Sequence, residues 1–187
     1  MFAIILSGLS LLNVAAQNEA ISDQQIEQIR SNCASTKNTL NQLHASDALL
    51  RVNMGQIYES MSTKLMDRFN GRVANNSFNN DNLVSITTSY NLVLDTFRSD
   101  YRYYEDQLSL AIGINCSNQP ITFYDAVSSA HTKRNQVHTD VVRLNQYIDK
   151  YQLAVNQFEE DYQTAIRGQN NNEWIATSAS SRWASAP

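Results

Sequence analysis

The chain has 187 residues, a length that favours a single domain, and 14 Lys and Arg against 18 Asp and Glu give it a net charge of −4. With only 5 Gly and 2 Pro it has too few turn-forming residues for an all-β or α/β fold of this size, so we predict an all-α protein. The acidic balance and the lack of a basic run exclude an electrostatic surface for nucleic acid, and no nucleic-acid partner is expected.

Residues 1–20 begin with an apolar segment that ends in small residues at Ala15 and Ala16. This pattern is typical of a signal peptide, with cleavage expected just after Ala16. The segment is shorter and more interrupted than the roughly 20 apolar residues of a membrane span. No Lys or Arg precedes it, so either the basic part of the signal lies further upstream or the segment is an uncleaved N-terminal anchor, the one place where we expect a membrane contact. A buried or frayed N-terminal helix is the alternative. We expect an extracytoplasmic protein, either periplasmic, at the cell surface or secreted.

Two cysteines, Cys33 and Cys116, agree with export, because an even pair in an oxidising compartment predicts one disulfide. A bridge that closes a loop of about 80 residues stabilises by up to about 4.5 kcal/mol in the chain-entropy account. The alternative is a pair of buried free thiols, which pack as small apolar residues.

The first predicted helix begins at a capping box formed by Ser22 and Gln25. It is expected to end near Phe69, because Asn70 and Gly71 both accept a left-handed conformation. Its apolar side chains repeat every seven residues in two sets, with one aspartate among them. The sets are Ile26, Cys33, Leu40, Asp47, Met54 and Met61, and Ile29, Thr36, Leu43, Leu50 and Ile57.

The second predicted helix follows a polar connection over residues 72–81 that Phe78 is expected to anchor. Asn80, Asp81 or Asn82 caps it, and Gly113 ends it. Its apolar positions are Leu83, Ile86, Tyr90, Leu94, Phe97, Tyr101, Tyr104, Leu108 and Ile112.

The third predicted helix runs from Thr122 to Ile166, since no glycine or proline lies between Pro120 and Gly168. At 1.5 Å per residue it is roughly 65–70 Å long. Beyond it we expect a disordered tail over residues 169–187. Two heptad positions form its coiled-coil-type seam. They are Val127, Arg134, Val141, Ile148, Val155 and Tyr162, and Ala130, Val137, Leu144, Tyr151, Phe158 and Ala165.

Short links between these helices predict an up-down-up bundle of three long antiparallel helices with coiled-coil-like packing over residues 21–168. The second helix is the shortest, so the first and third are expected to extend beyond it. An uncovered apolar stripe on that extension makes a homodimer possible.

Counted from the predicted disulfide, four charged residues fall at one level of the bundle: Asp47, Arg51, Asp100 and Arg134. One interpretation is a buried ion-pair network that fixes the register of the helices. We favour it because the aspartates balance the arginines one for one. The other interpretation is a site for a small acidic or zwitterionic molecule, since arginines hold carboxylates well.

Three histidines raise the question of a metal site. His131 and His138 lie seven residues apart and His44 is on another helix, whereas zinc ligands on a helix are normally closer in sequence. We expect neither a metal nor a cofactor. The chain also lacks the Gly-x-Ser-x-Gly, phosphate-loop and His-Glu-x-x-His motifs, and we expect no enzyme.

The function that these patterns favour is an exported, non-catalytic helical rod, a structural or protein-interaction module of the cell envelope with a protein partner still to be identified. The alternative is an extracytoplasmic ligand-sensing bundle that binds a small acidic or zwitterionic molecule at the polar layer. The two differ in one observable. A sensor has a cavity beside Asp47, Arg51 and Arg134, whereas a rod has a dry, filled layer there.

Overall fold

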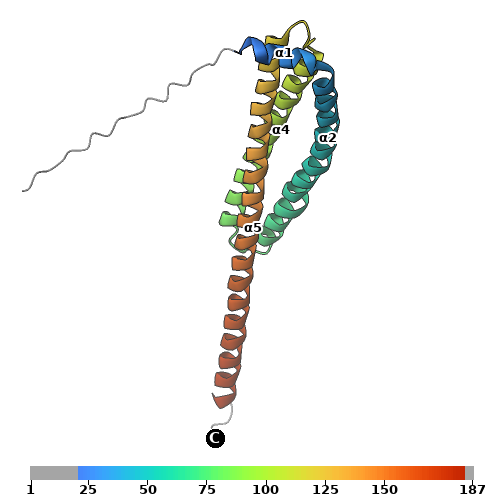
Figure 1. Ribbon diagram of the computed structural model, residues 1–187. Helices are drawn as coiled ribbons and strands as arrows, with labels where there is room; N and C mark the ends of the chain where they lie inside the picture. The colour runs from blue at the N-terminus through green and yellow to red at the C-terminus, as the bar shows by residue number, and fades with distance from the viewer. Residues whose placement is uncertain (1–20, 184–187) are drawn as a thin grey trace, which may run out of the picture.

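The computed structural model describes the backbone of residues 21–183 and the side chains of residues 21–168. Within that range the chain is helical apart from short links and forms no strand, which confirms the predicted all-α class. Figure 1 shows α2, α4 and α5 side by side along one long axis, with the chain reversing direction between α2 and α4 and again between α4 and α5. The predicted signal peptide or anchor over residues 1–20 lies outside the described residues.

The first predicted helix is divided at Asn32 into α1 (Asp23–Ser31) and α2 (Cys33–Ser60). Its start is as predicted, because the Ser22 hydroxyl accepts from the Gln25 amide while the Gln25 side chain accepts from the Ser22 amide at 2.8 Å. The break at Asn32 was not predicted. It lets α1 lie across the end of the other helices in Figure 1 instead of extending α2.

Past α2 the chain widens into a π-helix, η1 (Met61–Met66), and resumes as α3 (Asp67–Asn75). A π turn holds one more residue than an α turn, so the buried face changes its heptad position across η1. The helix also passes its predicted end at Asn70 and Gly71. Asn70 is buried and its amide donates to the Thr87 hydroxyl at 2.9 Å, which uses it as a core residue instead of a helix stop. The connection to α4 is therefore short, with Ser77 in a left-handed conformation at φ 61°.

Helix α4 (Asp81–Gly113) has the predicted bounds, but α5 (Pro120–Trp183) does not. It begins at Pro120, where the fixed φ and missing amide hydrogen of proline suit a first helical residue. It also continues through Gly168, because no glycine in the described part of the chain takes the positive φ of a helix-ending turn. The structure describes the backbone of residues 169–183 of the predicted tail as helix, and residues 184–187 lie outside the described range.

The packing of α5 differs from the predicted seam. Its second predicted heptad position is buried at Ala130, Leu144 and Tyr151, but the first is at most half-buried. Of the other buried residues of α5, Asp140 and Ala154 stand three residues after Val137 and Tyr151 of that second set, and Phe123 and Ala126 lie near the start of the helix. Helix α5 therefore faces α4 with a position that we did not assign to the core. In Figure 1 α5 alone extends beyond the other helices, and α2 bows away from it midway.

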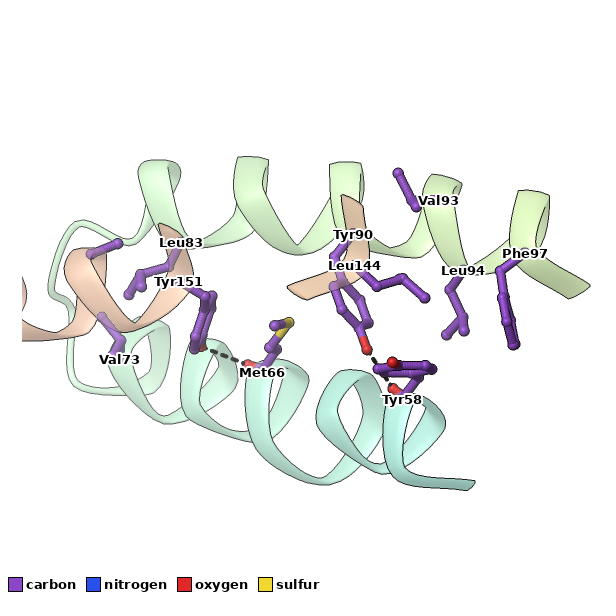
Figure 2. Packing of buried hydrophobic residues seen from close by; sticks show 11 residues of the cluster. Tyr58, Met66, Val73, Leu83, Tyr90, Val93, Leu94, Phe97, Leu144 and Tyr151 are labelled. Carbon is purple, nitrogen blue, oxygen red and sulfur yellow. Dashed lines mark hydrogen bonds between the residues drawn. The ribbon is translucent and has the colours of Figure 1, made fainter. Parts of the chain in front are cut away.

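Two core clusters hold the helices together. The larger lies at the η1 end and is shown in Figure 2, where Tyr90 points toward Tyr58 and Tyr151 toward Met66. The Tyr90 hydroxyl donates to the Tyr58 carbonyl at 2.9 Å, and the Tyr151 hydroxyl lies 3.2 Å from the Met66 carbonyl. The Tyr151 hydroxyl also lies 2.8 Å from the Asn70 side-chain oxygen, so hydroxyl contacts from α4 and α5 reach residues on both sides of η1.

The smaller cluster lies at the opposite end and surrounds the cysteine pair. Its buried members are Leu40, Tyr101, Tyr104, Leu108, Cys116, Phe123 and Ala130. Between the two clusters, where α2 bows outward, lies the site described next.

Candidate functional site

Cys33 and Cys116 form a disulfide with their Cα atoms 5.5 Å apart. It ties the first residue of α2 to the link between α4 and α5. Beside it the Lys37 ammonium donates to the Ile114 carbonyl at 3.2 Å. The N-terminal end of α2 is thereby held in a fixed register against the other two long helices.

Further along α2, Asp47 joins three helices at one level. Its carboxylate accepts from Arg134 of α5 through two bonds, Nε to Oδ2 at 2.8 Å and Nη2 to Oδ1 at 3.2 Å. The hydroxyl of Tyr104 on α4 donates to Oδ2 at 2.7 Å. Burial by itself raises the pKa of Asp47, but the bonds from Arg134 and Tyr104 outweigh it and leave that pKa below its usual value. Asp47 is therefore ionised at neutral pH.

The partners of Asp47 are held in their ordinary charge states. The hydrogen bond to Asp47 raises the pKa of Arg134 further above neutrality. Burial first, and then the bond to Asp47, raise the pKa of the Tyr104 hydroxyl, which stays protonated as a donor. The three side chains form a satisfied group with no proton to exchange near pH 7.

Arg51, one turn beyond Asp47 on α2, takes a different position. Its guanidinium carbon lies 5.0 Å from the centre of the Tyr101 ring, a cation–π contact between α2 and α4. Within residues 21–168 no carboxylate lies within ion-pair distance of Arg51, and no hydrogen bond engages its side chain. Arg51 therefore brings a positive charge that the surrounding side chains do not neutralise.

Asp100, the fourth residue of the predicted layer, does not join it. It lies instead beside Asp140, a buried carboxyl on α5, because the residues of α4 that face Asp47 are Tyr101 and Tyr104. Burial and then the charge of Asp100 raise the pKa of Asp140 to about 6, against a smaller opposing effect of Arg143. The predicted one-to-one balance of aspartates and arginines is thus wrong at this level of the structure.

Asp140 and Tyr104 are the residues that our sequence reasoning missed. Tyr104 was assigned to the apolar seam, and its role as a hydrogen-bond donor has no signature in a heptad pattern. Asp140 lies four residues before Leu144, so it shares a helix face with a core residue, and that spacing was the available signal.

Beside this polar group lies a cavity of about 480 Å³ between α2, α4 and α5, which we call the central cleft. Its volume falls within the roughly 300–1,000 Å³ of small-molecule sites. One part of its wall is polar and the remainder is apolar. The lining residues are Asp47, Leu50, Arg51 and Met54 of α2, Phe97, Tyr101 and Tyr104 of α4, and Arg134, Asn135, Val137, His138 and Val141 of α5.

Other kinds of site have less support in the described part of the chain. No cluster of three or more His, Cys, Asp or Glu residues there has the arrangement of a metal site, although His138 reaches the central cleft. No helix of the described residues is at once long and apolar enough to cross a membrane.

Comparison with protein-family models, with curated proteins and with solved structures gave no match for this chain.

Proposed function

We propose that the chain is an exported, non-catalytic helical module of the cell envelope that acts by binding another molecule in the central cleft. The observation that carries this proposal is the position of the cleft, a cavity of about 480 Å³ directly beside Asp47, Arg51 and Arg134. A rod with only a structural role would fill that level with side chains. The open layer favours the ligand-sensing alternative over the purely structural one.

The ionisation of Asp47 and Tyr104 gives no support to a role of these two residues as catalytic acid or base. A general acid or base works best with a pKa near the operating pH. Asp47 has a lowered pKa and Tyr104 a raised one, so neither titrates near neutrality. Asp140, with a pKa of about 6, lies outside the lining of the cleft and is buried between α4 and α5.

The architecture that we propose with this function is an up-down-up bundle of three long antiparallel helices. The α4–α5 pair packs in coiled-coil fashion, and α2 joins it at both ends. The core clusters at the two ends support this arrangement, and the cleft occupies the interval in which α2 departs from it.

Export is supported by the disulfide, because such bridges persist in oxidising compartments.

A protein partner is the second candidate occupant of the central cleft. It is favoured by the half-exposed side chain of Leu50, which lines the cleft and is 55% exposed.

Photocrosslinking in the native envelope tests the proposal. A photoreactive residue is placed at Leu50, inside the cleft, or at Leu92, which is 66% exposed on α4 and outside it. We expect adducts from the Leu50 position alone, read as a mass increase on the intact chain. A small ligand gives a mass increase too small to shift the band on a gel, and a protein partner gives a shifted band. Equal labelling from both positions, or none from either, would contradict a binding role for the cleft.

A further inference from the structure

The charges in the central cleft do not cancel. Two guanidinium groups, Arg51 and Arg134, face one carboxylate, Asp47, and that carboxylate already accepts two bonds from Arg134 and one from Tyr104. The lining therefore carries one surplus positive charge, located at Arg51. This sign is opposite to that of the chain as a whole, which has a net charge of −4.

Arg51 is held in a position that suits an anion. The guanidinium carbon of Arg51 lies over the ring of Tyr101, 5.0 Å from its centre, and such a cation–π contact limits the rotation of a long side chain. A guanidinium carries five N–H donors, and within residues 21–168 no side chain or backbone group accepts a hydrogen bond from Arg51, so these donors are open. Two parallel donors match the two oxygens of a carboxylate.

The remainder of the cleft is apolar. Met54 of α2, Phe97 of α4, and Val137 and Val141 of α5 line it, and all four pack in or against the larger core cluster. A ligand that places a charge on Arg51 thus has hydrocarbon surface within the same cavity for the rest of its body. Burying such surface contributes roughly 25 cal/mol per Å².

We infer that the central cleft selects a monoanionic amphiphile, a carboxylate with an aliphatic or aromatic body, with its carboxylate on Arg51 and its body against Met54, Phe97 and Val137. This inference rests on the proposed binding function and specifies the ligand class. A dianion such as a phosphate monoester fits less well, because it exceeds the single surplus charge and lies near the Asp47 carboxylate. A neutral molecule of the same shape leaves Arg51 without a counter-charge.

Calorimetric titration of the full-length, oxidised chain with decanoate, decanol, acetate and decyl phosphate tests the class. We expect decanoate to bind at least tenfold more tightly than decanol or decyl phosphate, and acetate to give no measurable binding. The comparison of decanoate with decanol isolates the charge. The comparison with decyl phosphate isolates the number of charges, and the comparison with acetate isolates the apolar body.

Two variants locate the anion. Arg51→Gln removes the surplus charge from an exposed position. We expect it to weaken the binding of decanoate at least tenfold and to leave the binding of decanol unchanged. Arg102→Gln is the matched control, since Arg102 is an exposed arginine of α4 outside the cleft. It should leave both affinities as they are. Circular dichroism verifies that both variants remain helical.

The outcomes separate this inference from the function on which it rests. Equal binding of decanol and decanoate, tighter binding of decyl phosphate, or unchanged decanoate binding in Arg51→Gln overturns the ligand class but leaves a cleft that binds apolar bodies. If none of the four compounds binds and the Leu50 crosslink traps a protein, the ligand class is wrong and the binding function stands. If none binds and Leu50 gives no adduct, both are wrong.

Discussion

Asp47 and Arg134 form one ion pair but differ greatly in exposure: the carboxylate side chain is 10% exposed and the guanidinium side chain 50%. The two halves of the pair are therefore not equivalent. Removing the arginine leaves a buried charge with one remaining partner, Tyr104. Removing the aspartate leaves an arginine that water can reach and a buried tyrosine hydroxyl that has lost its acceptor.

Asp47→Ala should therefore destabilise through Tyr104 more than through Arg134. We expect a loss of about 1–3 kcal/mol in the free energy of unfolding, the cost of an unsatisfied buried polar group. Urea denaturation of a double-mutant cycle with Tyr104→Phe measures the coupling. Tyr104→Phe should cost about 1 kcal/mol alone and close to nothing in the Asp47→Ala background. Additive losses would show that the Tyr104–Asp47 bond does not carry the effect.

Arg134→Gln should destabilise at neutral pH by about 1.5–3 kcal/mol, the range for hydrogen bonds to charged groups. Its pH dependence follows from Asp47. Because the folded pKa of Asp47 is lowered, its stabilising contribution is present above the unfolded pKa of about 3.9 and is lost as pH falls through the folded value. The difference in the free energy of unfolding between wild type and Arg134→Gln should thus shrink below about pH 4. A gap that stays constant from pH 7 to pH 3 would contradict this account.

Asp140→Asn should behave in the opposite way. The folded pKa of Asp140 is raised to about 6 by burial and by Asp100, so protonation stabilises the fold. This stability is complete below the unfolded pKa of about 3.9 and is lost as pH rises through about 6. We expect Asp140→Asn to be more stable than wild type by on the order of 2 kcal/mol at pH 8 and to show less change between pH 4 and 6. Thermal melts across that window test it, with Asp149→Asn, an exposed carboxylate of α5, as the control that should follow wild type.

Loss of the disulfide should cost about 2–4 kcal/mol, the typical range for a native bridge. Cys33 and Cys116 are 83 residues apart, so the bridge restricts a large part of the unfolded chain. Thermal melting of the Cys33→Ser, Cys116→Ser double variant, with and without reductant, gives the value. Reductant should lower the melting temperature of wild type and leave that of the variant unchanged.

Deleting one residue from η1 should be tolerated better than deleting one from α2. A π turn holds one residue more than an α turn, so removing the exposed Thr63 lets η1 become α-helical while Tyr58 and Val73 keep their buried faces. Deletion of the exposed Thr39 instead rotates the part of α2 that precedes this position relative to the part that follows it. Circular dichroism melts should show the Thr39 deletion to be the less stable by several degrees. The reverse order would indicate that η1 is required in its present form.

The helical class and most helix starts followed from local features of the sequence. Capping at Ser22, the start of α4 and its end at Gly113 depend on nearby residues alone, and these appear in the structure. Helix ends were predicted less well. Asn70 and Gly71 were interpreted as a stop, but a long-range bond from Asn70 to Thr87 makes them part of a helix.

The candidate site could be predicted only in part for a geometric reason. Counting residues from the disulfide places side chains at a level along an axis, and Asp47, Arg51 and Arg134 do line one cleft. It does not give the rotation of each helix about its own axis. That rotation directs Asp100 toward Asp140 instead of Arg134, and so leaves Arg51 without a carboxylate.

Helix α2 is attached to its neighbours at both ends, at one by the disulfide and at the other by the tyrosine hydroxyls around η1. A helix attached in this way cannot slide along its axis when something enters the space beneath its middle. It can only change its curvature. Any response to an occupant of the cleft should therefore appear as sideways movement of the segment near Arg51, with both attachments unmoved. Under the proposed binding function, a piston-like shift of α2 is therefore not expected, and bending of α2 is the expected response.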